Sequence, residues 1–395
     1  MEQVLKVAGE LPKPSGRSDV PPFMVMDVMA AAARLEAAGI HVVHMEVGQP
    51  AAAAPATALA AARAALGGRI AYTESLGIGS LRARIARHYG ERYGVDVDPA
   101  RVIVTTGSSA GFMLAFLALF ESGERVAFAN PGYPPYRHIL TALGCEPALI
   151  ETSAATRWAL DPAALIAAHR ARPLAGVLVA SPANPTGTMM TGAALGGLIA
   201  AAEEAQIRFI SDEIYHGLDY AFPAVTAAAL SGRAIVINSF SKYFCMTGWR
   251  IGWMVVPEPL VRPIERLQQN FSISVPTLSQ VAAEAAFDGI AEMEAVKHGY
   301  EENRRILVEG LPGAGLDNFL PADGAFYLYA DVSRFTNDSH DFAKRMLAEA
   351  HVAATPGVDF DPVNGNKFIR FCYAGSQEDA RAAVARVGRW LGGSG

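Results

Sequence analysis

A short apolar run that ends in polar and reactive side chains constrains the fold of this chain more than any other feature. Residues 234–237 read Ala-Ile-Val-Ile, which is typical of a strand buried on both faces of a parallel sheet. Ser239, Ser241 and Lys242 follow where the run stops. Because ligands of open α/β sheets bind beyond the carboxyl ends of such strands, the sequence predicts a binding site at this point.

The residues around Lys242 indicate which ligand this site would take. A lysine after a strand is most often a solvated surface residue, but the sequence that follows Lys242 is Tyr-Phe-Cys-Met, which favours a desolvated side chain. A desolvated amine near another cation has a lowered pKa and forms Schiff bases with carbonyls. Ser239, Ser241 and Arg250 carry the donors that bind a phosphate. A carbonyl and a phosphate on one ligand point to pyridoxal phosphate (PLP).

The block S-x-S-K-x(7)-R at 239–250, together with the overlapping T-G-W-R-x-G-W at 247–253, resembles the lysine motif of the class I/II (fold-type I) PLP-dependent aminotransferases. The resemblance extends in order from Gly48 to Arg370. It implies an α/β fold with a mostly parallel, seven-stranded sheet between helices, plus a smaller α+β domain. It also implies a transaminase that moves an amino group between an L-amino acid and a 2-oxo acid through an aldimine on Lys242.

A glycine- and serine-rich turn forms a second candidate phosphate site. The strand expected over 102–106 leads through Gly107, Ser108 and Ser109 into an apolar helix over 112–120. Backbone N–H groups and the helix dipole at such a turn bind anions. Either serine could equally serve as an ordinary helix cap, and one turn can do both.

Three further strand ends carry candidate site residues. Tyr133 lies in N-P-G-Y-P-P-Y, Asn184 in N-P-T-G, and Asp212 and Tyr215 in D-E-I-Y. A carboxylate that faces the pyridine nitrogen keeps it protonated, and Asp212 fits this role. The resemblance implies that Tyr133 stacks on the pyridine and that Asn184 and Tyr215 donate to its phenolic oxygen. Taken alone, a proline-rich turn and the pattern D-E-x-Y are both common in proteins and are weak evidence for a PLP site.

An arginine near the C-terminus is the candidate substrate anchor. Residues 367–373 alternate in polarity, and we expect an edge-region strand that carries Arg370. An arginine in an apolar strand is costly unless it meets a carboxylate. The resemblance implies that Arg370 binds the substrate α-carboxylate, beside Gly48 and Asn184, although a structural ion pair is the alternative. The nearby loop 356–361 departs from the family pattern because it lacks a glycine after Phe360.

The alternation of elements predicts how the chain is divided. We expect an N-terminal arm and helix over 1–48, a large PLP-binding domain over 49–285, and a small C-terminal domain over 286–395 that the N-terminal segment joins. Tyr72 begins the pattern Y-x(4)-G-x(3)-L-R. In the resembled family this tyrosine reaches the cofactor phosphate of the neighbouring subunit, which implies a homodimer with shared active sites.

Composition argues against several other classes of protein. A net charge of −6 and a pI near 5.9 disfavour a nucleic-acid partner. Apolar runs reach about half of a membrane span, so we expect no membrane segment. The three cysteines are widely spaced and the nine histidines lack ligand spacing, so we expect neither a disulfide framework nor a metal site. A reducing cytoplasm is the expected location.

Two alternatives to transamination share the same cofactor residues. A PLP lyase that acts at the β or γ carbon would use the same motifs and break a different bond. A non-catalytic PLP-binding regulator would need a DNA-binding module, but only about 45 residues precede the core and none forms a basic helix-turn-helix. The G-x-G at residues 77–79 lacks a preceding βα unit and a third glycine, which argues against a dinucleotide site.

The sequence also predicts the polarity of the substrate side chain. In relatives that act on acidic substrates, a lysine can occupy the turn position of Ser109, and this chain has no cation there. Tyr133, Tyr136 and Phe23 favour an apolar or neutral pocket instead. We therefore expect a neutral or hydrophobic amino donor, unless a mobile residue such as Arg17 enters the site.

Overall fold

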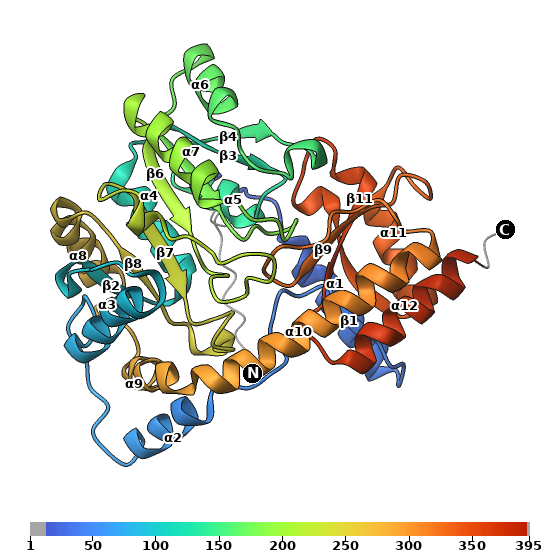
Figure 1. The fold of residues 1–395 in the computed structure, drawn as a ribbon, viewed down its shortest axis with the longest axis horizontal. Helices are drawn as coiled ribbons and strands as arrows, with labels where there is room; N and C mark the ends of the chain where they lie inside the picture. Colours follow the sequence, from blue (N-terminus) through green and yellow to red (C-terminus); the bar gives the residue numbers. More distant parts are fainter. Residues whose placement is uncertain (1–12, 393–395) are drawn as a thin grey trace, which may run out of the picture.

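A seven-stranded sheet forms the centre of the larger part of the computed structural model, which describes residues 13–392 (Figure 1). In spatial order its strands are β2 (Val102–Thr105), β8 (Gly252–Val255), β7 (Ile235–Ser239), β6 (Arg208–Asp212), β5 (Gly176–Ala180), β3 (Arg125–Asn130) and β4 (Glu146–Glu151). The neighbours from β7 to β4 pair in parallel, and β8 is antiparallel to both β7 and β2. The predicted α/β fold with a mostly parallel sheet is confirmed.

Helices cover both faces of this sheet because its strands are apolar on both sides. Ile103 packs on one side, and its neighbours Val102 and Val104 pack on the other. The first face is covered by α4 (Gly107–Leu119), α5 (Pro134–Ala142) and α8 (Glu258–Ser272). The second face is covered by α3 (Gly79–Tyr93), α6 (Pro162–Ala171), α7 (Gly192–Glu204) and α9 (Thr277–Ala286), and α2 (Ala56–Ala65) packs on α9.

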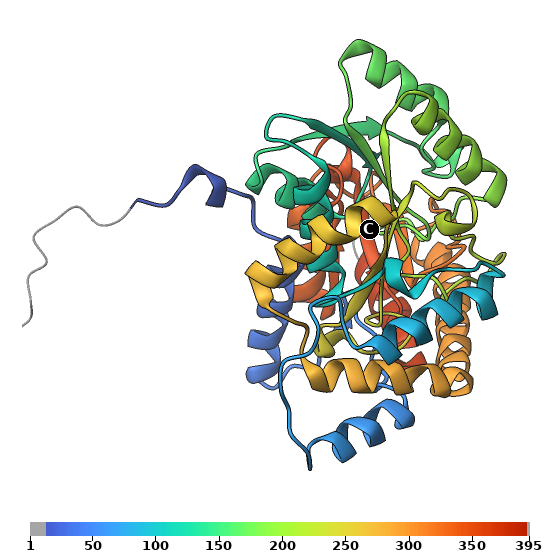
Figure 2. The ribbon, with the colours of Figure 1, turned by 90° about the vertical axis from the view of Figure 1, so that its left-hand side faces the viewer.

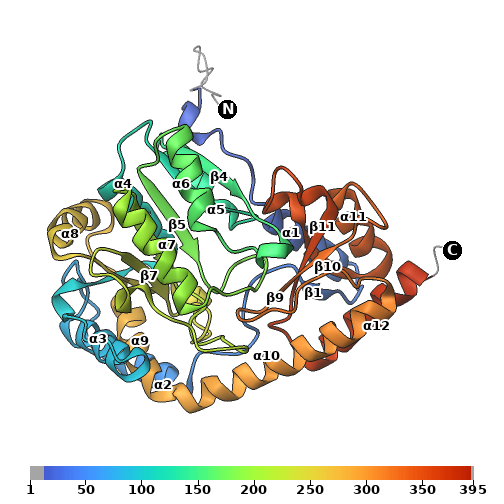
Figure 3. The same cartoon turned by 45° about the horizontal axis from the view of Figure 1, so that its top comes forward.

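A second, four-stranded sheet combines the two ends of the chain. Its order is β1 (Val43–Met45), β10 (Val352–Pro356), β11 (Phe368–Cys372) and β9 (Tyr327–Asp331). β1 pairs in parallel with β10, so blue and red elements lie together in Figure 1. The helices of this part are α1 (Met24–Ala37), α11 (Ser339–Arg345) and α12 (Gln377–Gly392). The long helix α10 (Ile290–Gly310) runs along both parts (Figure 3). The domain limits at 48/49 and 285/286 remain predictions.

One expectation about strands was wrong, and one strand was not anticipated. β11 is not an edge strand, because it lies between β10 and β9 and pairs with both. Its burial on both sides explains why its alternating pattern was misleading. β8 was not anticipated, because its first two residues, Gly252 and Trp253, belong to the lysine motif. The helix α2 begins at Ala56, directly after Pro55.

The segment before α1 extends away from the body of the molecule (Figure 2). It contains the short turn Gly16–Ser18, in which Arg17 is exposed. The first part of the predicted N-terminal arm, residues 1–12, lies outside the described residues. Within residues 13–392, no helix is both long and apolar enough to cross a membrane.

Candidate active site

The loops at one edge of the large sheet bring most of the predicted site residues together. Parallel strands β3, β5, β6 and β7 end at this edge, and the loops after them carry Tyr133, Asn184, Tyr215 and Lys242. Because β8 runs the other way, it begins at the same edge, two residues after Arg250. The cavity at this edge has a volume of about 520 Å³. Its lining includes the predicted residues Gly48, Ser108, Ser109, Tyr133, Asn184, Tyr215, Ser241, Lys242, Arg250 and Arg370.

Lys242 lines this cavity, and the pKa of its amine is lowered. Its Nζ donates to the backbone oxygen of Gly48 at 2.6 Å, which joins the two sheets across the site. Burial, together with the charges of Arg370 and Arg250, lowers the pKa of Lys242 to about 8, against the opposing effects of Cys372 and Asp212. An amine with a pKa near 8 is available as a nucleophile and as a base near neutral pH.

One end of the cavity has the form of an anion site. Gly107 has φ of +72°, which favours glycine, and a Cβ there would lie 2.5 Å from Nη2 of Arg250, so a side chain at this position would displace the guanidinium. Ser108 and Ser109 follow in the first turn of α4, where N–H groups lack partners within the helix. Arg250 itself has φ of +49°, a conformation that costs a non-glycine residue roughly 1–3 kcal/mol and is typical of functional sites.

Ser239 differs from the other predicted phosphate ligands. It is buried and does not line the cavity. Its hydroxyl donates to Oγ of Ser241 at 2.8 Å, and Ser241 does line the cavity. In this arrangement Ser239 supports Ser241 from behind, so direct contact between Ser239 and a phosphate remains a prediction.

Asp212 lies buried at the end of β6 and next to the charge of Lys242. One carboxylate oxygen accepts from the hydroxyl of Tyr136, and the other accepts from the backbone N–H of Ile214 at 3.1 Å. Burial raises the pKa of Asp212 to about 6, although these hydrogen bonds and Lys242 act in the opposite direction. Asp212 is therefore ionised at neutral pH and suited to hold a protonated ring nitrogen.

Arg370 is buried, and it has no carboxylate partner among the described residues. Its guanidinium donates to Oδ1 of Asn184 at 2.9 Å, to the backbone oxygen of Glu46, and to the hydroxyl of Thr355 at 3.2 Å. Nε has no partner, and no carboxylate forms an ion pair with Arg370 within residues 13–392. The structural ion pair that was the alternative is therefore not observed there. A buried cation of this kind fits an incoming carboxylate.

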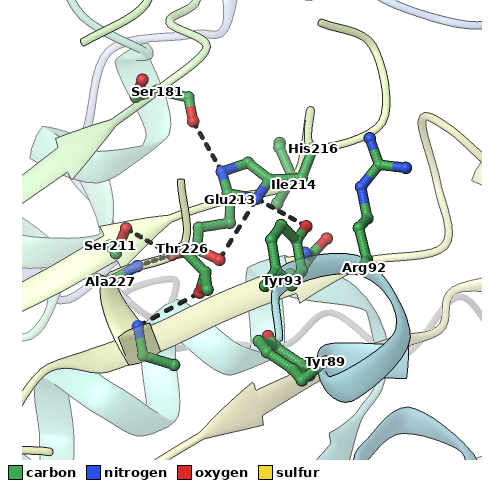
Figure 4. Close-up of polar contacts among 12 residues, drawn as sticks. Tyr89, Arg92, Tyr93, Ser181, Ser211, Glu213, Ile214, His216, Thr226 and Ala227 are labelled. Atoms are coloured by element: carbon green, nitrogen blue, oxygen red, sulfur yellow. Dashed lines mark hydrogen bonds and ion pairs between the residues drawn. The ribbon is translucent and has the colours of Figure 1, made fainter. Parts of the chain in front are cut away.

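A buried polar network supports the turn that carries Tyr215 (Figure 4). Nε2–H of His216 donates to the backbone oxygen of Ser181 at 3.0 Å, so its Nδ1 accepts from the hydroxyl of Tyr93 at 2.9 Å. Oε2 of Glu213 lies 3.5 Å from that Nδ1. Burial raises the pKa of Glu213 to about 7 and lowers that of His216 to about 4. This network ties the strand end before Asn184 to the turn of Tyr215.

The loop that lacks the expected glycine is closed in another way. Asp361 stands after Phe360, and its Oδ1 accepts from the backbone N–H groups of Val363 and Asn364, both at 2.8 Å. The same oxygen accepts from Nδ2 of the buried Asn130 at 2.7 Å. The aspartate thus joins this loop to the end of β3, where the loop of Tyr133 begins.

Several residues of the cavity were missed by the sequence analysis. Val25 and Met26 of α1 and Tyr327 of β9 line it, whereas Phe23 was anticipated. The network partners Glu213 and His216 were also missed. Tyr327 was not identified because nothing in the sequence pattern indicated which face of its strand meets the site.

Tyr72 lies apart from this cavity. It is 79% exposed and lines a separate surface groove with residues 274–278. Its predicted contact with a phosphate is therefore not made within the same chain, as expected if it belongs to a partner's site. Arg17 does not line the cavity either.

The donor set fits PLP. The anion site of Gly107, Ser108 and Arg250 suits a phosphate. Lys242 is a buried amine that suits an aldehyde, and Asp212 is a buried carboxylate that suits a ring nitrogen.

Comparisons with known proteins agree with this geometry. The family model "Aminotransferase class I and II" matches residues 40–387. A valine–pyruvate aminotransferase from Mycobacterium tuberculosis is 48% identical over 380 residues, which cover 95% of this chain and 97% of that protein. A (5-formylfuran-3-yl)methyl phosphate transaminase from Methanocaldococcus jannaschii is 33% identical over 93% of this chain and 96% of that protein.

A solved structure of a putative aminotransferase from Silicibacter pomeroyi superimposes with a TM-score of 0.91 at 52% identity, over 97% of this chain and all of that one. These similarities support transamination and give no support to the lyase alternative. The chain therefore belongs to the class I and II aminotransferases, and it is a PLP-dependent enzyme that acts on amino acids and 2-oxo acids.

Proposed function

We propose that this aminotransferase takes its amino group from an L-amino acid with a neutral, apolar side chain. The observation that carries the proposal is the lining of the cavity. Phe23, Val25 and Met26 supply an apolar wall from the start of α1. Within the described part of the chain, the basic residues that line the cavity are Lys242, Arg250 and Arg370. The proposed mechanism already assigns them to the cofactor aldehyde, the phosphate and the substrate α-carboxylate, so none remains for a side-chain carboxylate.

The name of one relative supports the same donor class. The Mycobacterium tuberculosis protein is named for valine and pyruvate, an apolar donor and a small neutral acceptor. A buried carboxylate without a cation costs roughly 1–3 kcal/mol or more, so a pocket of this kind discriminates against aspartate.

Each site residue has a distinct task in the proposed reaction. When bound, PLP supplies the aldehyde that takes the amino group and the ring that withdraws electrons from the reacting carbon. Arg370 binds and orients the α-carboxylate of the substrate, with Gly48 and Asn184 beside it. Nζ of Lys242 takes the proton from the substrate Cα, for which its lowered pKa is suited.

The remaining residues hold the cofactor in place. Gly107, Ser108, Ser109, Ser241 and Arg250 bind the phosphate through backbone N–H groups, hydroxyls and the guanidinium, with Ser239 behind Ser241. Asp212 keeps the ring nitrogen protonated, and Tyr133 packs against the ring. Asn184 and Tyr215 donate to the phenolic oxygen.

A panel of donors tests the proposed substrate class. With pyruvate as acceptor, we expect kcat/KM for valine, leucine or alanine to exceed that for aspartate by at least ~10-fold, because aspartate would bury an unpaired carboxylate. If kcat/KM for aspartate is the highest of the panel by tenfold or more, the inference from Ser109 is wrong.

A charge placed at Ser109 provides the matched control. Ser109→Lys should raise kcat/KM for aspartate relative to valine, whereas Ser109→Met, which has a similar length without the charge, should not. An equal response to both variants would mean that size rather than charge sets the preference.

We also propose a homodimer with shared active sites. Tyr72, at 79% exposure, lines a surface groove with Ile70. Hydrogen bonds join residues 73–75 to the segment that follows α8, and Phe271 at the end of α8 and Ile273 after it are about half exposed, as is Ile70. Exposed apolar side chains in such number favour burial against another protein surface. We propose that a second copy of this chain covers this surface, because the hydroxyl of Tyr72 could then reach the phosphate in the partner's site.

Mixing two defective variants tests this sharing. If Tyr72→Phe and Lys242→Ala subunits are exchanged, each hybrid dimer should regain one intact site, so activity should rise clearly above the sum of the two parents. Activity that stays at that sum, or an active monomer in light scattering, would refute shared sites.

The cytoplasmic location is part of the proposal as well. Cys145, Cys245 and Cys372 are all free and buried, which suits a reducing compartment.

A further inference from the structure

Tyr327 makes contact with three residues to which the proposed function gives a task, and one of them, Gly48, contacts a fourth, Lys242. It comes from β9 of the smaller sheet, it is 1% exposed, and it lines the cavity. Its hydroxyl lies 2.7 Å from that of Tyr215. Its ring lies 4.4 Å from Cζ of Arg370. A Cβ on Gly48 would collide with its hydroxyl, and the oxygen of Gly48 accepts from Lys242.

The hydroxyl pair has a defined direction if Tyr215 donates to the cofactor. Either hydroxyl could donate to the other, but each has one proton. If the proton of Tyr215 points to the phenolic oxygen, the proton of Tyr327 must point to Tyr215. A hydroxyl that accepts one hydrogen bond becomes a stronger donor in the next, so Tyr327 would strengthen the bond that Tyr215 makes.

The ring of Tyr327 has a separate task. The guanidinium of Arg370 lies between two aromatic rings, with Cζ 4.4 Å from the centre of Tyr327 and 4.6 Å from that of Phe360. Such contacts stabilise a desolvated cation and fix its plane. Arg370 has no carboxylate partner among the described residues, so these rings help to hold it ready for a substrate carboxylate.

We propose that Tyr327 is a positioning residue of the transamination site, whose hydroxyl aims and strengthens the hydrogen bond from Tyr215 to the phenolic oxygen and whose ring holds Arg370. This inference rests on the proposed roles of Tyr215 and Arg370. It separates two effects of one side chain, the first on the cofactor and the second on the substrate carboxylate.

The first effect is measured on the substrate-free holoenzyme, by following the absorbance of the cofactor bound to Lys242 against pH. In Tyr327→Phe the hydrogen bond from Tyr215 to the phenolic oxygen is weaker, so the negative charge on that oxygen is less stabilised and attracts the proton on Nζ more strongly. We therefore expect the midpoint of the absorbance titration to move to higher pH by about 0.5 unit. Tyr329→Phe is the matched control, because Tyr329 is buried on the same strand and its hydroxyl has no partner.

A double variant tests the pathway of the effect. In a Tyr215→Phe background, Tyr327→Phe should move the midpoint by less than ~0.2 unit, because the hydroxyl has lost the residue through which it acts. The inference is overturned if Tyr327→Phe matches Tyr329→Phe, or if the shift persists undiminished without the hydroxyl of Tyr215.

The second effect appears in KM. Tyr327→Phe keeps the ring, so KM for the amino acid should stay within about twofold, whereas Tyr327→Leu should raise KM by roughly 5–10-fold. An equal KM for both variants, with melting temperatures matched to the wild type, would remove the proposed role of the ring. The absorbance measurement needs no substrate, so an error in the proposed donor class would leave that result intact.

Discussion

Replacement of Lys242 by alanine is expected to lower kcat for transamination by about 10⁴-fold, which corresponds to ~5.4 kcal/mol in the barrier. The variant loses the amine that anchors the cofactor and the base that takes the proton from the substrate Cα. No other lysine lines the cavity in the described part of the chain, so none can take over these tasks. The measurement is steady-state kcat with valine and pyruvate at saturating cofactor.

Lys344→Ala serves as the matched control, because Lys344 is exposed on α11 and should leave kcat unchanged. Borohydride treatment of the wild-type holoenzyme should remove its yellow colour and attach the cofactor to a peptide that contains Lys242. A Lys242→Ala enzyme that still turns over at the wild-type rate would refute the assignment.

Replacement of Asp212 by asparagine should lower kcat by about 100-fold, or ~2.7 kcal/mol, while PLP stays bound. Asparagine keeps the volume and can still accept from Tyr136, but it removes the charge that keeps the ring nitrogen protonated. Cofactor content is measured by absorbance and kcat by the same coupled assay, so loss of binding and loss of rate are told apart.

Asp323→Asn is the control for removal of a buried carboxylate in general. Asp323 is 7% exposed, pairs with Arg157, and does not line the cavity. We expect this variant to lower stability more than kcat. If Asp212→Asn costs less than tenfold in kcat, another group must protonate the ring.

Local sequence was sufficient for the features that lie on single strand ends. The apolar runs of β5, β6 and β7 predicted buried parallel strands, and the residues at or just beyond their ends, Asn184, Asp212 and Lys242, came to one edge of the sheet. This follows from geometry, because parallel strands share the edge at which they end. The anion site also follows from a local pattern, since Gly107 and the serines after it lead directly into a helix.

Tertiary structure alone decided the features that depend on which distant segments pack together. Arg370 was expected on an edge-region strand, yet the sheet buries it between β10 and β9, because partners of a strand are chosen by segments far away in the chain. Tyr327 meets Tyr215 from another sheet, and Tyr93 meets His216 across 123 positions. Local periodicity records which side chains are apolar, but only packing determines which buried polar groups find one another, because each must be satisfied by whatever partner the fold brings within reach.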